Sequence, residues 1–291
     1  MMKEYGEVLD NVDLKKYNTY GIGGIARFLV SPYSVTHLQG LLEYLDSNNI
    51  PWYILGGGSN VILPDDDFAG AIISLKSIDQ YEIKKDVISV GAGIRLGVMV
   101  KKMLDDGFTN YGSLMGIPGL LGGAIVGNAG AYGISIFDYL ISVTVMDRNG
   151  NISILEKEDI KYDYRYTELK NNGVIVIAAS FLGIKGNVAE ELEKIEDNMQ
   201  KRKSTQPLEY KNAGSVFRNP PNFSAGYLIE HAGLKGLAIG GAKVSERHAN
   251  FIINYNNAKS RDIIELIGVI KKKVKLRFNE ELKLEQVIVK W

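Results

Sequence analysis

The spacing of apolar residues predicts alternating helices and strands in the first third of the chain. In 34–48, SVTHLQGLLEYLDSN, apolar side chains recur every three or four positions, which is typical of an amphipathic helix, and Ser34 stands where an N-cap is expected. The aromatic and β-branched run IPWYIL at 50–55 predicts a strand, and GGGSN at 56–60 predicts a glycine turn after it. A second helix is expected over 96–107, LGVMVKKMLDDG. This mixture indicates an α+β architecture.

The remainder of the chain continues the pattern and suggests a division. ISVTVMDRNGNISIL at 141–155 predicts a β-hairpin around its Arg-Asn-Gly-Asn turn, and VIVIAASFLGI at 174–184 predicts a buried strand. A polar helix is expected over 187–203, and another helix begins near Ser260, with isoleucines on one face and lysines late in the helix, where cations suit the helix dipole. We place a domain boundary near residue 200, where charged residues, proline and glycine coincide.

Composition narrows the possible partners. The chain has 291 residues, and 34 basic side chains balance 34 acidic ones, so no general positive field exists to hold nucleic acid or an anionic membrane surface. Cysteine is absent, which excludes disulfides, thiolate catalysis and cysteine-ligated metal centres. The N-terminal residues contain no apolar targeting segment, and no uninterrupted apolar run reaches the roughly 18 residues of a membrane span. We expect a cytoplasmic protein.

Three glycine clusters are the candidate ligand loops: GIGGIA at 21–26, GGGSN at 56–60 and GSLMGIPGLLGGAIVGNAGAYG at 112–133. The first cluster formally matches a dinucleotide fingerprint, but that motif needs a helix after it and the β-like RFLV follows instead. Glycines let consecutive N–H groups converge on an anion, because no Cβ blocks the approach. One cluster alone would indicate a tight turn; three in the first 133 residues favour a cofactor cradle.

Four polar residues stand in informative surroundings. Arg165, between tyrosines in YDYRYT, is either held by stacking for anion recognition or is a surface arginine. Strand-like alternation in LKLEQVIVKW places Glu285 on the face of the valines that follow, where a carboxylate is either ion-paired or held protonated for proton transfer. Ser215 follows Ala-Gly without a nucleophile elbow, so by itself it indicates a turn. His248 has no second ligand at metal spacing, and we expect no metal site.

Seven segments, in order along the chain, together resemble one family. They are NTYGIGGIARF (18–28), ILGGGSNVIL (54–63), GIPGLLGGAIVGNAGAYG (116–133), YDYRYTELK (162–170), NAGSVFRNPP (212–221), LIEHAGLKGLAIGGAKVSERHANFIIN (228–254) and LKLEQV (282–287). The family is that of the bacterial UDP-N-acetylenolpyruvoylglucosamine reductases, flavoenzymes of peptidoglycan precursor synthesis. The length of the chain and the short path from Arg165 to Ser215 resemble the shorter subclass of these enzymes.

The resemblance implies an α+β fold with two functional domains. An FAD-binding domain of the vanillyl-alcohol-oxidase (PCMH) type would occupy 1–200, in subdomains of about 1–70 and 71–200, and a substrate-binding α+β domain would occupy 201–291. It implies non-covalent FAD, NADPH as reductant and UDP-N-acetylglucosamine enolpyruvate as substrate. Hydride would reach the methylene carbon of the enolpyruvyl ether, and the charge developing beside the carboxylate must be stabilised and protonated. We expect a monomer with no nucleic-acid or membrane partner.

The resemblance also implies a role for each matched residue. Ser215 would be the proton donor, Arg165 the cation on the enolpyruvyl carboxylate, and Glu285 the acid partner. Three residues would contact the UDP-sugar: Asn219, Lys235 and His248. The flavin contacts are expected at Gly56, Gly57, Gly58, Ser59, Asn60, Gly116, Ile117, Pro118, Gly119, Gly122, Gly123, Asn128, Ala129, Gly130 and Ala131.

The chain departs from the family pattern in two places, and two alternatives stay open. Leu120 stands where a small hydroxyl residue is expected, so one flavin-phosphate contact is lost or comes from the backbone. The usual Leu-Glu-Pro-Glu-Val is LKLEQ here, with Glu285 in register. An oxidase that tethers its flavin covalently would need a cysteine or histidine, and 49–230 contains neither. A non-catalytic nucleotide-sugar sensor would be expected to lack Arg165, Ser215 or Glu285.

Overall fold

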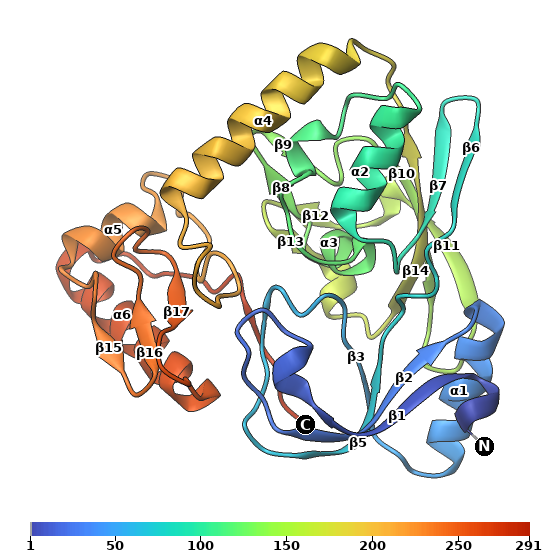
Figure 1. Cartoon of the computed structure of the whole chain (residues 1–291), viewed down its shortest axis with the longest axis horizontal. Helices are drawn as coiled ribbons and strands as arrows, with labels where there is room; N and C mark the ends of the chain where they lie inside the picture. The colour runs from blue at the N-terminus through green and yellow to red at the C-terminus, as the bar shows by residue number, and fades with distance from the viewer. Residues whose placement is uncertain (1) are drawn as a thin grey trace. The chain divides into compact units, whose positions relative to one another are not determined.

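The computed structural model describes residues 2–291, which form two compact units (Figure 1). The first unit contains the chain up to Asp10 and the stretches Phe28–Gly57 and Ala69–Gln200. The second unit contains Asn11–Arg27, Gly58–Phe68 and Lys201–Trp291. Each unit has its own hydrophobic core.

A four-stranded sheet follows the N-terminus, in the order β1 (Gly6–Asp13), β2 (Ile25–Pro32), β5 (Phe68–Ile73) and β3 (Trp52–Ile54). Because the strand β2 begins at Ile25, within GIGGIA, where a dinucleotide motif needs a helix, that motif is excluded. The helix predicted over 34–48 is confirmed as α1 (Val35–Ser47), and the Ser34 hydroxyl accepts the N–H of His37 at 3.3 Å. The apolar stripe of α1 lies in the first core: Leu38, Leu41, Leu42 and Leu45.

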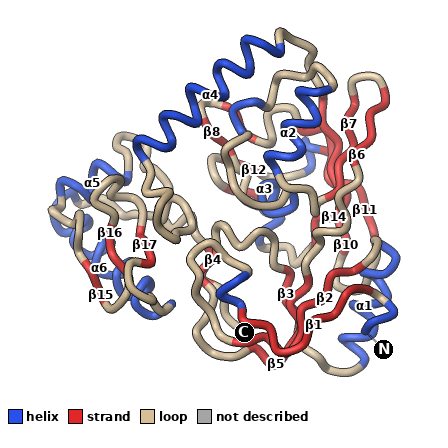
Figure 2. The backbone as a smooth tube through the Cα atoms, in the orientation of Figure 1, coloured by secondary structure: helices blue, strands red, loops and turns tan. Residues whose placement is uncertain are grey.

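The main sheet of the first unit has five antiparallel strands, drawn in red in Figure 2. Their order is β11 (Ile152–Glu156), β10 (Leu140–Met146), β14 (Ile175–Leu182), β7 (Val87–Gly91) and β6 (Tyr81–Lys84). The predicted hairpin is confirmed by the pairing of β10 with β11. Its turn is closed by Asp147, whose carboxylate accepts the backbone N–H groups of Asn149 and Asn151.

Helices and short hairpins complete the first unit. They are α2 (Leu96–Asp105), α3 (Leu121–Val126), the pair β8 (Gly130–Ala131) with β9 (Ile134–Ser135), and the pair β12 (Tyr162–Asp163) with β13 (Tyr166–Thr167). The polar helix α4 (Val188–Thr205) was predicted over 187–203, and the chain passes from one unit to the other after its residue Gln200. Short 3₁₀ helices cover Met2–Glu4, Gly112–Leu114, Lys157–Asp159 and Glu168–Lys170 in the first unit, and Leu14–Lys16 in the second.

The second unit contains α5 (Ala225–His231), α6 (Ser260–Phe278) and the antiparallel strands β15 (Ala238–Ile239), β16 (Ala242–Val244) and β17 (Ile252–Asn254). The strand β4 (Val61–Ile62) pairs in parallel with β18 (Val287–Ile288). The helix predicted near Ser260 is confirmed, and the Asp65 carboxylate accepts the N–H and the hydroxyl of Ser260 at 2.9 and 2.8 Å. An acceptor from outside the helix thereby caps its N-terminus.

Candidate active site

Two of the predicted flavin loops approach each other within the first unit. A Cβ atom added to Gly57 would lie 2.6 Å from the Cα of Gly119, so only glycine allows the two backbones to come this close. Gly119 has φ +123°, a conformation that other residues rarely adopt. A Cβ added to Gly56, in contrast, would meet no heavy atom of residues 2–291 within 4 Å. Glycine at 57 and 119 therefore serves the fold, and glycine at 56 leaves space beside the loop.

The centre of the glycine-rich stretch folds into the helix α3. The first two N–H groups of α3 donate to the carbonyl oxygens of Ile94 and Ala92, both at 2.9 Å. The third N–H group belongs to Gly123, in the first turn of the helix, where N–H groups have no carbonyl partner one turn earlier within the helix. Apart from its chain neighbours and the backbone of its own helix, no heavy atom would lie within 4 Å of a Cβ added to Gly123. Leu120 is the N-cap and contributes its backbone carbonyl, which accepts the N–H of Ala124 at 3.1 Å. Leu120 thus contributes to this loop through its backbone, and a leucine side chain is compatible with that role.

Asn128 carries a buried polar atom that needs a partner. Its backbone has φ +42°, its side-chain Nδ2 donates to the Asp163 carbonyl at 2.9 Å, and its Oδ1 has no hydrogen-bond partner among residues 2–291. A buried acceptor without a donor is costly, so a bound group with an N–H or O–H would satisfy it. Ala129 follows, and Gly130 and Ala131 form the strand β8.

Arg165 is hydrogen-bonded to the loop of Asn128–Gly130. Its backbone adopts φ +55°, and its guanidinium donates to the carbonyl oxygens of Gly130 and, at 3.4 Å, Asn128. The guanidinium also lies over the ring of Tyr164, 5.0 Å from the ring centroid. Of the two interpretations of YDYRYT, the stacked arginine is the one present, and Arg165 is a half-buried cation of fixed orientation.

The second half of GGGSN, residues 58–60, belongs to the second unit, and the contacts of Gly58 and Asn60 stabilise the fold. A Cβ added to Gly58 would lie 2.2 Å from the Tyr17 carbonyl oxygen, and Gly58 has φ +63°. The Asn60 side chain donates to the backbone carbonyl of Glu285 at 3.3 Å, and the Asn60 carbonyl accepts the N–H of Val287 at 3.0 Å. Ser59 lies between them, half-buried.

The second unit brings the segment of Ser215 next to that of Glu285. The N–H of Glu285 donates to the Val216 carbonyl at 2.9 Å, and Phe217 forms a bridge with Leu284. Both Ser215 and Glu285 are half-buried. The strand β18 begins only at Val287, so the alternation proposed from the sequence does not fix the direction of the Glu285 side chain. Its register is set instead by backbone pairing with 216.

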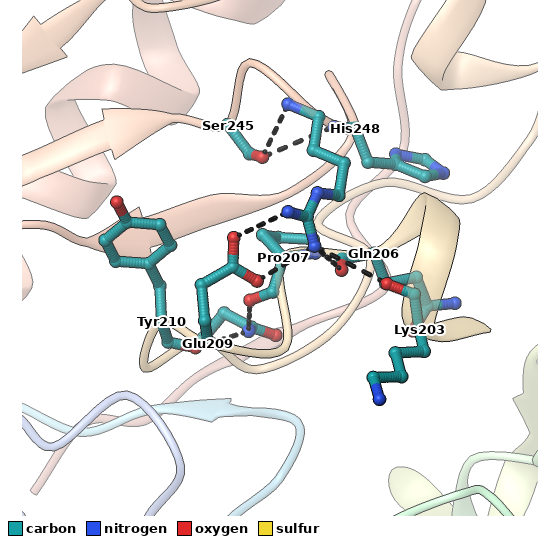
Figure 3. A network of polar contacts seen from close by, with 9 residues as sticks. Lys203, Gln206, Pro207, Glu209, Tyr210, Ser245 and His248 are labelled. Carbon is teal, nitrogen blue, oxygen red and sulfur yellow. Dashed lines mark hydrogen bonds and ion pairs between the residues drawn. The ribbon is translucent and has the colours of Figure 1, made fainter. Parts of the chain in front are cut away.

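The three residues expected at the UDP-sugar also lie in the second unit. Asn219 is exposed, and its Oδ1 accepts the N–H of Ala225 at the start of α5. Lys235 forms an ion pair with Glu230 at 2.8 Å. His248 lies in a turn where the Ser245 hydroxyl accepts its N–H at 3.3 Å (Figure 3).

The surroundings of His248 favour its neutral form. Burial lowers the pKa of its imidazole below the usual 6.5, with a smaller contribution in the same direction from Lys235 and an opposing one from Glu230. The backbone N–H of Asn250 donates to His248 Nδ1 at 3.2 Å, so the neutral ring carries its proton on Nε2. His248 can therefore present a hydrogen-bond donor at Nε2 without carrying a charge.

Sequence reasoning missed the buried amides that hold the Ser215 segment. Gln286 and Asn250 are 2% and 3% exposed. Asn250 accepts the N–H of Phe217 at 3.0 Å and donates to its carbonyl at 2.8 Å. The available signal was a polar amide inside an apolar run, in HANFII and in LEQVIV, since a buried amide must find partners.

The candidate residues thus form one group in each unit. The first unit gathers the glycine loops around Gly57, Gly119 and Asn128 together with Arg165. The second unit gathers Ser215 with Glu285. The stretch Gly116, Ile117 and Pro118 precedes the close approach at Gly119, and the Ile117 N–H donates to the Leu114 carbonyl at 3.0 Å.

Comparison with known proteins gives the class of this chain. Residues 26–156 match the family described as FAD binding domain, and within that match the first unit contains Gly56, Gly57 and the glycine-rich stretch 112–133. Residues 206–289 match the family described as UDP-N-acetylenolpyruvoylglucosamine reductase, C-terminal domain. The chain is therefore a protein with an α+β FAD-binding domain followed by a second, smaller domain, as predicted.

Relatives that align over nearly the whole chain give the family. The chain is 42% identical to the UDP-N-acetylenolpyruvoylglucosamine reductase of Caldanaerobacter subterraneus subsp. tengcongensis, over 99% of this chain and 95% of that protein. It is 38% identical to the enzyme of the same name from Clostridium novyi, over 97% and 92%. The crystal structure of the Thermus caldophilus reductase superposes with a TM-score of 0.81 at 31% identity, covering 98% of this chain and 99% of that one. The chain belongs to the UDP-N-acetylenolpyruvoylglucosamine reductase family.

The residues present fit an FAD group. The unsatisfied Asn128 Oδ1 is a buried acceptor for a ligand N–H or O–H, and the open sides of Gly56 and Gly123 would be filled by any side chain. Among residues 2–291, no helix combines the length and apolar character needed to cross a membrane.

Proposed function

We propose that this chain catalyses the NADPH-dependent reduction of UDP-N-acetylglucosamine enolpyruvate to UDP-N-acetylmuramate, a step of peptidoglycan precursor synthesis. The observation that carries the proposal is the end-to-end similarity to relatives named as this reductase, at up to 42% identity over 99% of the chain. The proposal keeps FAD binding in 1–200 and substrate binding in 201–291.

The proposed reaction adds a hydride and a proton across the carbon–carbon double bond of the enolpyruvyl ether. When bound, FAD supplies the hydride chemistry, with NADPH as reductant. The hydride reaches the methylene carbon, and negative charge develops at the carbon that bears the carboxylate. Arg165 pairs with that carboxylate; its guanidinium is held by the carbonyl oxygens of the Asn128–Gly130 loop and by the Tyr164 ring.

The proposed proton donor is Ser215. A serine hydroxyl is a weak acid, so it needs a stabilised transition state and a nearby acid partner. Glu285 takes that role in the proposal, supported by the backbone hydrogen bond that pairs it with Val216, the residue after Ser215. Asn219, Lys235 and His248 bind the UDP-sugar, with Lys235 supplying a cation and His248 a neutral donor.

The flavin contacts in the proposal follow the glycine loops. Two observations support three of these contacts most directly. Space is open beside Gly56 and Gly123, where an added Cβ would lie, and Asn128 has a buried acceptor without a partner among residues 2–291. The remaining proposed contacts are those predicted from the sequence in 57–60, 116–119, 122 and 129–131.

The test compares the two half-reactions, which are reduction of the flavin by NADPH and transfer from the reduced enzyme to the substrate. Purified protein should be yellow, and its oxidation of NADPH should depend on added UDP-N-acetylglucosamine enolpyruvate. Ser215→Ala should still have its flavin reduced by NADPH but turn over at least about 100-fold more slowly. Ser153→Ala, at an exposed position of β11, is the control. A colourless protein, or NADPH oxidation indifferent to the substrate, would refute the proposed function; an undiminished rate in Ser215→Ala would remove only the role of Ser215.

A further inference from the structure

A buried glutamine holds the backbone immediately before Ser215. Gln286 Nε2 donates to the carbonyl oxygens of Ala213 and Gly214, both at 3.1 Å, and Gln286 Oε1 accepts the Tyr20 hydroxyl at 3.1 Å. Gln286 is 2% exposed and Tyr20 is fully buried. Because buried polar groups that lose their partners are strongly disfavoured, these three bonds fix the orientation of the amide and of the two carbonyl groups together.

The Ser215 segment needs such a restraint because it begins with a permissive residue. Gly214 has φ +74°, and a Cβ added there would meet no heavy atom of residues 2–291 within 4 Å, so neighbouring side chains do not confine this turn. Its carbonyl is held by Gln286, and its N–H donates to Asn212 Oδ1 at 3.0 Å. The two residues after Ser215 are held by the backbone carbonyl and the side chain of Asn250. Polar contacts therefore fix the segment on both sides of Ser215.

We propose that Gln286, itself oriented by Tyr20, is a positioning residue for Ser215. By fixing the carbonyl groups of Ala213 and Gly214, Gln286 sets the direction in which the Ser215 hydroxyl delivers its proton. Gln286 acts through the loop and needs no contact with substrate or cofactor. The inference rests on the proposed function, in which Ser215 donates the proton to the enolpyruvyl carbon.

The decisive variant is Gln286→Leu, which keeps the approximate size of the side chain and removes all three hydrogen bonds. We expect transfer from the reduced enzyme to the substrate to slow at least about tenfold, since small displacements of a reacting group are costly. The solvent deuterium isotope effect on this step should increase, because proton delivery becomes the slower event. The rate of flavin reduction by NADPH should not change. Tyr20→Phe keeps both Nε2 bonds and should show a smaller effect in the same direction.

A readout that does not depend on catalysis completes the experiment. In the protein freed of FAD, amide hydrogen exchange of 212–217 should be faster in Gln286→Leu than in the parent chain. Ser260→Ala is the matched control, because it removes another buried hydrogen bond of the second unit, to Asp65, and should lower the unfolding temperature without changing either half-reaction.

The outcomes separate the inference from the proposed function. Unchanged exchange in 212–217, an unchanged transfer step, or equal slowing of both half-reactions in Gln286→Leu would overturn the positioning role. A parent chain whose NADPH oxidation does not respond to the substrate would overturn the proposed function instead, and the exchange measurement would still test the restraint by Gln286.

Discussion

Arg165 combines a left-handed backbone with a firmly held guanidinium. A non-glycine residue at φ +55° costs conformational energy that surrounding contacts must offset. Here the contacts are the carbonyl oxygens of Asn128 and Gly130 and the ring of Tyr164. The arrangement orients a permanent cation, which is what recognition of a carboxylate requires.

Replacing Arg165 by lysine tests whether that orientation matters. Lysine keeps the charge but loses the planar fork that bonds to two carbonyl groups, so we expect kcat/KM for the enolpyruvyl substrate to fall by about 100-fold. Steady-state kinetics with varied substrate measure the change. Arg148→Lys is the control, because Arg148 is an exposed arginine that also stacks on an aromatic ring, that of Trp52 at 5.0 Å. Equal losses in the two variants would argue against a specific role for Arg165.

His248 gives the folded protein a predictable response to acid. Burial lowers the folded-state pKa of His248 below 6.5, so the unfolded chain binds a proton more readily than the folded chain as the pH falls through this range. The contribution to stability is therefore fully present above the unfolded pKa and is lost on acidification. Neighbouring Lys235 acts in the same direction as burial, and Glu230 opposes it.

The measurement is thermal unfolding from about pH 7.5 down to about pH 5. The unfolding temperature of His248→Gln should decrease less over this range than that of the parent chain, because the variant lacks the imidazole that takes up a proton on unfolding. His231→Gln, at an exposed histidine of α5, is the control and should follow the parent. A parallel decline in His248→Gln and the parent would contradict the assignment.

At the scale of elements, the spacing of apolar residues predicts those helices and strands whose contacts lie within their own sequence. The helix α1 has its cap at Ser34 and its buried leucines within its own sequence, so 34–48 was sufficient to predict it. The strand expected around Glu285 begins only after it, at Val287. The Glu285 N–H pairs with the Val216 carbonyl and the Glu285 carbonyl with the side chain of Asn60, 225 residues away in the sequence. Spacing within 282–291 carries no information about such partners.

The helix α3 offers a test of the predicted flavin cradle, because one substitution in it should separate protein stability from FAD affinity. Gly123→Ala places a Cβ where no atom beyond its chain neighbours and its own helix backbone lies within 4 Å, and alanine is the better helix former by about 1 kcal/mol, so the protein without FAD should be as stable or more stable. FAD affinity should nevertheless fall at least about tenfold, because the methyl group occupies space that the proposed cradle leaves for the cofactor beside the backbone. Urea unfolding and fluorescence titration with FAD separate the two effects.

A matched glycine in α6 supplies the control for that test. Gly268 is exposed and also has no described atom within 4 Å of an added Cβ. Gly268→Ala should gain a comparable stability and bind FAD with unchanged affinity. If both alanine variants bind FAD as the parent does, Gly123 does not belong to the cradle.

At the scale of the whole molecule, the two units draw on distant parts of the chain. The core of the second unit includes Tyr20, Ile22 and Ile62 beside the apolar residues of 201–291. The Asn254 side chain also donates to the Tyr20 carbonyl at 2.8 Å. A boundary near residue 200 can be inferred from composition, but pairings across more than 200 residues leave no periodic signal in the sequence. The family resemblance supplies the order of segments, and only the structure assigns 11–27 and 58–68 to the second core.

This composition of the second core predicts that residues 201–291 do not fold alone. Removing Tyr20, Ile22 and Ile62 would cost roughly 4.5–9 kcal/mol at about 1.5–3 kcal/mol for each buried side chain, comparable with the whole stability of a domain of this size. The isolated segment would also lose β4, the partner of β18, and the hydroxyl that orients Gln286. Circular dichroism and amide NMR of the fragment should show low helicity and poor dispersion, whereas the full chain should give a cooperative transition. A fragment with dispersed resonances and a sharp thermal transition would show that 201–291 is self-sufficient and that 11–27 and 58–68 are accessory to it.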